Sequence, residues 1–105
     1  MIRIYYAADG DGHELCVEGH AGYDEHGRDI VCAGVSALAQ ALLGWLDDNA
    51  QYVTELCGPV VQQGRLWVSC RGSKKLTIAF QVALMGMKQI ADAYPGHVKI
   101  TGIDR

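Results

Sequence analysis

A pair of short alternating segments joined by a turn occurs twice in this chain, and a long apolar stretch with helical periodicity follows each pair. Alternation of apolar and polar residues predicts a half-buried strand, because successive side chains of a strand point to opposite faces. The turn Asp9-Gly10-Asp11-Gly12 divides the first pair, whereas Gly58-Pro59 and Gln62-Gln63-Gly64 interrupt the second. The predicted strands cover residues 2–8, 13–21, 52–57 and 65–70.

Each of the two predicted helices is preceded by a residue that can cap its first turn. One helix extends over Ile30–Asp48 and follows Asp29, and the other follows Ser73 and continues to about Tyr94, where Pro95-Gly96 ends it. Asp and Ser favour the N-cap position because their side-chain oxygens accept hydrogen bonds from free backbone N–H groups. Apolar residues occur nearly all round the first helix, which predicts burial on more than one side, for example in an oligomer interface.

A last short strand is predicted over residues 97–103, which completes the order ββαββαβ. This order predicts an α+β fold, a two-layer sandwich of a mixed or antiparallel sheet with two long helices. With 105 residues, of which 50% are hydrophobic, the chain can bury one modest core but not two. Residues 1–105 are therefore expected to form a single domain.

Composition and charge argue against several classes of protein. The net charge is −3 and the basic residues are scattered, with Lys74-Lys75 the only adjacent pair, so nucleic-acid binding is not expected. The longest apolar run falls short of the roughly 18 to 20 residues of a membrane span. The four cysteines are widely spaced and the first residues alternate as a strand does, so we expect free thiols and a cytoplasmic protein.

Cys32 is a candidate functional residue because of its place in the first predicted helix. With Asp29 as the N-cap it is the third helical residue, where free N–H groups and the helix dipole favour an anion. Helix N-termini lower the pKa of a thiol from about 8.5 toward neutrality, and their N–H groups can also stabilise an oxyanion. His20, on the polar face at the end of the second strand, can act as the base. Nucleophilic attack on a peptide is therefore one hypothesis.

Two other hypotheses fit the same residues. Free cysteine is among the most buried residue types, so Cys32 can be a packing residue and His20 a solvated side chain. The other hypothesis is zinc binding, although the short paired spacings of structural zinc motifs are missing. The four side chains that would hold the metal are Cys16, His20, His26 and Cys32. The residues alone leave the three hypotheses open.

The other notable residues are assigned structural places. Gly22–Asp29 contains two glycines and four charged residues without apolar periodicity, which predicts an exposed loop. Cys57 and Cys70 lie on predicted strands and are expected in the core. His13, beside the first turn, and His97, at the start of the last strand, are expected at the surface.

The segment from Gly19 to Leu38 resembles the signature of the ribosomal-processing cysteine protease family, Prp. In that signature a G-H-A segment is followed, after a short loop, by D-I-V-C-A and then by a serine one helical turn later. The matching elements here are Gly19-His20-Ala21, Asp29-Ile30-Val31-Cys32-Ala33 and Ser36. The closing "YPGHVKI" and the length of the chain extend the resemblance more loosely.

The resemblance implies a cytoplasmic, homodimeric cysteine endopeptidase that removes an N-terminal extension from a protein of the large ribosomal subunit. It implies no metal, cofactor, nucleic acid or membrane. Cys32 matches the nucleophile and His20 the general base of a thioester mechanism, while Gly19, Asp29 and Ser36 match supporting positions. The loop thought to cover the substrate is matched by Gly22, Tyr23, Asp24, Glu25, His26, Gly27 and Arg28. The alternative is a non-enzymatic module that binds a peptide or the ribosome and has a structural thiol.

Overall fold

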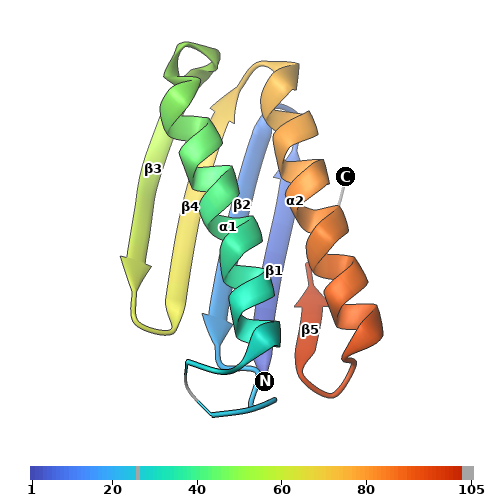
Figure 1. Ribbon diagram of the computed structural model, residues 1–105. Helices are drawn as coiled ribbons and strands as arrows, with labels where there is room; N and C mark the ends of the chain where they lie inside the picture. Colours follow the sequence, from blue (N-terminus) through green and yellow to red (C-terminus); the bar gives the residue numbers. More distant parts are fainter. Residues whose placement is uncertain (26, 103–105) are drawn as a thin grey trace.

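Five strands form one mixed sheet, and two helices lie side by side on one of its faces (Figure 1). The computed structural model describes residues 1–25 and 27–102. The elements are β1 (Ile2–Asp9), β2 (Gly12–Gly19), α1 (Ile30–Asp48), a short 3₁₀ helix (Ala50–Tyr52), β3 (Val53–Gln62), β4 (Arg65–Gly72), α2 (Lys74–Ala93) and β5 (Val98–Thr101). The strand order is β3-β4-β2-β1-β5, with β1 and β5 parallel and the other pairs antiparallel. The predicted α+β class, order and layers are confirmed.

The two hairpins form as predicted, but β2 ends at Gly19 and β3 continues to Gln62, whereas the predicted strands end at residues 21 and 57. In the first, Asp9 pairs with Gly12 across a tight turn. In the second, β3 continues through Gly58-Pro59, and the register with β4 shifts between Cys57 and Val60. The predicted interruption is therefore a bulge within one strand, which is a common feature of edge strands.

Both helices begin where the capping residues place them. The Asp29 side chain accepts hydrogen bonds from the N–H groups of Val31 and Cys32, and the Ser73 side chain accepts one from Lys75. The pattern of apolar residues and the caps act locally, which explains why both helix starts are confirmed.

In the single chain α1 buries one stripe, not several sides as predicted. The stripe has helical spacing and consists of Val31, Val35, Ala39, Leu42 and Leu46. Much of the remaining apolar surface of the helix stays accessible, and Ile30 is 59% exposed. Among residues 1–25 and 27–102, α1 is the one helix that is long and apolar enough to cross a membrane, with a mean hydropathy of 1.6. Core helices of soluble proteins meet the same criteria, and the buried stripe of α1 belongs to the core shared with the sheet.

His13 lies in the core, so the prediction of a surface position is wrong. The residue is 3% exposed, and its ring stacks on Phe80 with centroids 4.7 Å apart. Its Nδ1 is hydrogen-bonded to the Tyr6 hydroxyl at 2.9 Å and its Nε2 to the Thr77 hydroxyl at 3.2 Å. His13 shares the inward face of β2 with Leu15, and these partners make the burial of a polar ring acceptable.

Cys57 and Cys70 have different environments, although both were expected in the core. Cys70 is 3% exposed, as predicted, whereas Cys57 is exposed. Cys57 lies on β3, which is the edge strand, and pairs with Ser69 of β4. Ser69 alternates with the buried Val68 and Cys70, so this register position faces away from the helices.

Candidate active site

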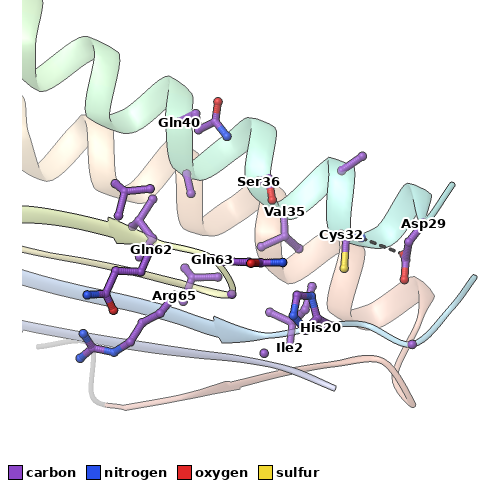
Figure 2. A pocket seen from close by; sticks show the side chains of 18 of the residues that line it. Ile2, His20, Asp29, Cys32, Val35, Ser36, Gln40, Gln62, Gln63 and Arg65 are labelled. Carbon is purple, nitrogen blue, oxygen red and sulfur yellow. Dashed lines mark hydrogen bonds between the residues drawn. The ribbon is translucent and has the colours of Figure 1, made fainter. Parts of the chain in front are cut away.

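A groove of about 460 Å³ runs between the first half of α1 and the turn that joins β3 to β4 (Figure 2). The end of β2 and the loop that follows it also line the groove. Cys32, His20, Asp29 and Ser36 all line it. Gly19 lines it too, so the structure brings the predicted catalytic pair and all three supporting residues to one surface.

The Cys32 thiol lies at the start of α1 and is half-buried at the groove. Its Sγ accepts a hydrogen bond from the backbone N–H of Ala21, at 3.2 Å. Ala21 directly follows His20, so this bond ties the thiol to the segment that carries the imidazole. Because Cys32 lines an open groove, a substrate can reach the sulfur.

The position of His20 depends on the glycine before it. Gly19 has a φ of 92°, and a Cβ at this residue would collide with the backbone oxygen of Met1. This conformation ends β2 and breaks its alternation, so His20 lines the groove on the side of the helices. The predicted placement of His20 with the polar face of the strand is therefore wrong, although the prediction that it lies at a strand end is confirmed.

The β3–β4 turn lies directly against His20, a contact that the sequence did not predict. The Gly19 N–H donates a hydrogen bond to the Gly64 carbonyl at 2.9 Å. A Cβ added to Gly64 would lie 3.2 Å from His20 Nε2. The sequence predicts an interruption at Gln62-Gln63-Gly64, but only the sheet order reveals that this turn meets the end of β2.

Asp29 connects the loop to the start of α1. Its Oδ1 accepts hydrogen bonds from Val31 and Cys32, both at 3.0 Å, and its Oδ2 accepts from Tyr23 at 3.0 Å and Asp24 at 3.4 Å. Burial alone raises the pKa of this carboxyl, but the four N–H donors outweigh burial and lower the pKa below its ordinary value. Asp29 is thus an ionised cap with partners on both oxygens.

The same bonds change one expectation about catalysis. The N–H groups of Val31 and Cys32 donate to Asp29 Oδ1, so they are already engaged. The expectation that N–H groups at the helix start receive a substrate oxyanion is therefore wrong for these two residues.

The loop between β2 and α1 is exposed as predicted. Among its described residues, Gly22, Asp24 and Gly27 line the groove. Tyr23, Glu25 and Arg28 are also exposed, whereas His26 lies outside the described residues.

Ser36 lies one helical turn after Cys32 and faces the same groove. Three amide side chains that the sequence did not single out, those of Gln40, Gln62 and Gln63, also line the groove. Figure 2 shows Gln63 beside Val35 and His20, and Gln40 and Gln62 further from the thiol. The three amides come from α1 and from the β3–β4 hairpin, which are far apart in the sequence.

The zinc hypothesis has little geometric support. No group of three or more His, Cys, Asp or Glu side chains in residues 1–25 and 27–102 is placed to hold a metal ion. Cys16 pairs with Trp67 and Tyr5 on the sheet, and burial raises the pKa of its thiol. Cys16 alternates with the inward Leu15, so it faces away from the helix layer and from Cys32.

His97 contributes to this region, whereas the sequence predicted an ordinary surface residue. The residue is half-buried, and its Nδ1 lies 2.8 Å from the carbonyl oxygen of Ala21. It precedes β5, which pairs in parallel with β1 and so returns the chain to the end of the sheet where β2 stops. The sequence contains no local pattern that indicates this contact.

Known proteins resemble this chain over most of its length. A family model for the cysteine protease Prp matches residues 1–99. The chain is 34% identical to the ribosomal processing cysteine protease Prp of Mycoplasma pneumoniae over 83 residues, which are 79% of this chain and 80% of that protein. It is 29% identical to the protein of the same name from Mycoplasma genitalium over 87 residues, 82% of this chain and 84% of that protein.

A solved structure also has this fold. The crystal structure of an essential ribosomal processing protease Prp from S. aureus, in complex with a covalently linked product peptide, matches with a TM-score of 0.79. The match covers 98% of this chain and 100% of the S. aureus chain, at 19% sequence identity. Together with the match of the family model over residues 1–99, these similarities lead to one conclusion: the chain belongs to the Prp family of cysteine proteases.

Proposed function

We propose that this protease removes an N-terminal extension from a protein of the large ribosomal subunit, with Cys32 as nucleophile and His20 as general base. The observation that carries the proposal is the hydrogen bond from the Ala21 N–H to Cys32 Sγ at 3.2 Å. This bond places the sulfur beside the residue that follows His20, at a groove open to a substrate. The substrate class is supported by the relatives, which are ribosomal processing cysteine proteases.

The reaction proceeds through a thioester. His20 takes the proton of the Cys32 thiol, and Cys32 Sγ attacks the carbonyl carbon of the scissile peptide. When the C–N bond breaks, His20 returns the proton to the leaving amine, and the N-terminal fragment remains on Sγ as a thioester. Water then attacks the thioester with His20 as base, which releases the acid and restores the thiol.

The groove suits an extended peptide. Apolar side chains of α1 and β4, such as Val35 and Leu66, line one part, and the amides of Gln40, Gln62 and Gln63 line another. Apolar walls with a few polar groups are typical of ligand sites, because the apolar part contributes affinity and the polar groups fix orientation. Gly22, Asp24 and Gly27 line one edge of the groove, and the loop to which they belong is proposed to cover the bound peptide.

We further propose that the protease acts as a homodimer in the cytoplasm, without binding nucleic acid. The outer surfaces of α1 and α2 form an apolar groove, which is lined by Leu38, Ala41, Leu42, Trp45, Lys75, Ile78, Ala79, Val82 and Ala83. Ile78 and Val82 are 61% and 66% exposed in the single chain. A second copy that covers this surface would bury the apolar side of α1 that the core leaves accessible.

The test is incubation with a panel of N-terminally extended ribosomal proteins, with fragment masses as the readout. One cut near the end of an extension, lost in Cys32→Ala and in His20→Ala, is the expected result. Cys57→Ala is the matched control, because Cys57 is exposed and does not line the groove. Binding of the extended proteins without any cleavage would instead favour a non-enzymatic peptide-binding module. Cleavage that survives in Cys32→Ala would refute the assignment of the nucleophile.

A further inference from the structure

The backbone of Ala21 is held at both ends by side chains from distant parts of the chain. Its N–H donates to Cys32 Sγ at 3.2 Å, and its carbonyl oxygen lies 2.8 Å from His97 Nδ1. A carbonyl oxygen can only accept, so His97 carries a proton on Nδ1 and donates it to Ala21. Ala21 is 3% exposed, so water has little access to replace either partner.

His97 is itself firmly placed. Its backbone N–H donates to the carbonyl of Tyr94 at 2.9 Å, and its own carbonyl accepts from the N–H of Ile2 at 2.9 Å. Tyr23 packs edge-on against the His97 ring, with centroids 5.4 Å apart, and against Tyr94, with centroids 5.2 Å apart. The imidazole therefore links the start of β5 to the segment that follows His20.

We propose that His97 is a positioning residue of the active site, which restrains the Ala21 backbone so that the Ala21 N–H points at Cys32 Sγ. The inference rests on the proposed role of Cys32 as the nucleophile. An N–H donor stabilises a thiolate more than a thiol, so the orientation of the Ala21 N–H affects how readily the sulfur reacts. The same orientation fixes the chain direction at His20, the residue before it.

Without the Nδ1 donor, the Ala21 carbonyl oxygen would lose its hydrogen bond from His97 and would remain buried. The peptide would then gain by turning toward water, because a buried carbonyl without a donor is costly. The Ala21 carbonyl and the Ala21 N–H lie in successive peptides joined at the Ala21 Cα, so a turn that changes the Ala21 backbone dihedrals would also shift the N–H relative to Sγ. The effect of His97 on Cys32 is thus transmitted through the backbone of one residue, Ala21, and needs no contact between the two side chains.

Two substitutions separate the hydrogen bond from the packing of the ring. His97→Phe retains an aromatic ring for Tyr23 to pack against, but it removes the donor. His97→Asn removes the ring but retains an N–H donor, since the amide nitrogen is the same number of bonds from Cα as Nδ1. Lys99→Ala, on the exposed side of β5, is the matched control.

The measurement is the rate of Cys32 alkylation by iodoacetamide as a function of pH, read by peptide mass mapping, with thermal unfolding recorded in parallel. In His97→Phe the rate at neutral pH should fall about threefold to tenfold and the midpoint of the profile should move upward. His97→Asn should restore most of the wild-type rate, and Lys99→Ala should match the wild type. A wild-type profile in His97→Phe would overturn the proposal, as would an equal loss in both His97 variants.

Alkylation also separates this proposal from the proposed function. The assay reports on the thiol and needs no peptide substrate. If the wild type fails to cut any extended ribosomal protein but its alkylation depends on His97, the positioning role stands and the proteolytic substrate is wrong. If cleavage occurs and kcat is unchanged in His97→Phe, the protease stands and the positioning role is wrong.

Discussion

Gly64→Ala tests whether the β3–β4 turn controls the position of His20. A Cβ at Gly64 would lie 3.2 Å from His20 Nε2 and 3.6 Å from Cε1. The first distance is shorter than an ordinary van der Waals contact, so the imidazole or the turn must shift by a few tenths of an ångström. The turn is held to Gly19 by a backbone hydrogen bond, which leaves the imidazole as the group that moves.

The variant has a second effect, which a control can isolate. Gly64 has a φ of 74°, where a residue with a Cβ costs about 1 to 2 kcal/mol. Gly10, in the β1–β2 turn, has a φ of 60°, and a Cβ there would have no atom within 4 Å. Gly10→Ala therefore carries a similar backbone strain without touching the active site.

Both variants should lose about 1 to 2 kcal/mol of unfolding free energy in urea, and their Tm should fall by roughly 4 to 16 °C. Only Gly64→Ala should lose catalytic efficiency, by about tenfold in kcat/KM, because small displacements of a catalytic group slow the chemical step. The assay is hydrolysis of a synthetic leader peptide well below either Tm. Wild-type kcat/KM in Gly64→Ala, or an equal loss in Gly10→Ala, would refute the reasoning.

Three further predictions concern titration and reactivity. Because the pKa of Asp29 is lowered in the folded state, its ionised form stabilises that state. The unfolding free energy should therefore be highest well above pH 3.8, the ordinary pKa, and should fall as the carboxylate is protonated. In Asp29→Asn the unfolding free energy, measured in urea at a series of pH values, should fall less steeply in acid. Burial raises the pKa of the Cys70 thiol from 9.0 to about 11, so this thiol ionises at lower pH in the unfolded state than in the folded state. The unfolding free energy should therefore fall by up to about 3 kcal/mol between pH 9 and pH 11. The same dependence of unfolding free energy on pH in Cys70→Ala would contradict this. Iodoacetamide at pH 8 should label Cys32 faster than the other thiols and Cys70 slowest, and equal labelling of all four would count against the nucleophile.

The parts of the fold that depend on neighbouring residues could be predicted from the sequence. Asp29 and Ser73 cap the two helices as expected, because a cap is formed with residues two or three positions away. The place of Cys32 in the first turn follows from the same local rule. The alternation of β2 failed at Gly19, whose φ of 92° turns His20 toward the helices.

The contacts that depend on the sheet order could not be predicted. The turn at Gly64 meets Gly19 because β4 pairs with β2, and His97 meets Ala21 because β5 pairs with β1. His13 was misplaced for a different reason: its alternation with Leu15 puts it on the inward face, but the partner that helps to satisfy its ring there, Thr77, lies on α2. Each of these contacts joins residues more than 40 positions apart, and no local pattern in the sequence records them.

The hydrogen bonds around the loop divide it into two parts with different constraints. Ala21 is fixed by Cys32 and His97, whereas Tyr23 and Asp24 are fixed by Asp29 Oδ2. If the loop opens to admit a peptide, the bonds to Asp29 Oδ2 must break, but those to Ala21 need not. Gly22 lies between the two parts; its φ is 66°, and a Cβ added there would have no atom within 4 Å. The hydrogen bonds of Ala21 can therefore persist while the residues after Gly22 move, because the two sets of hydrogen bonds use different partners, although the edge-on contact of Tyr23 with His97 would then be lost.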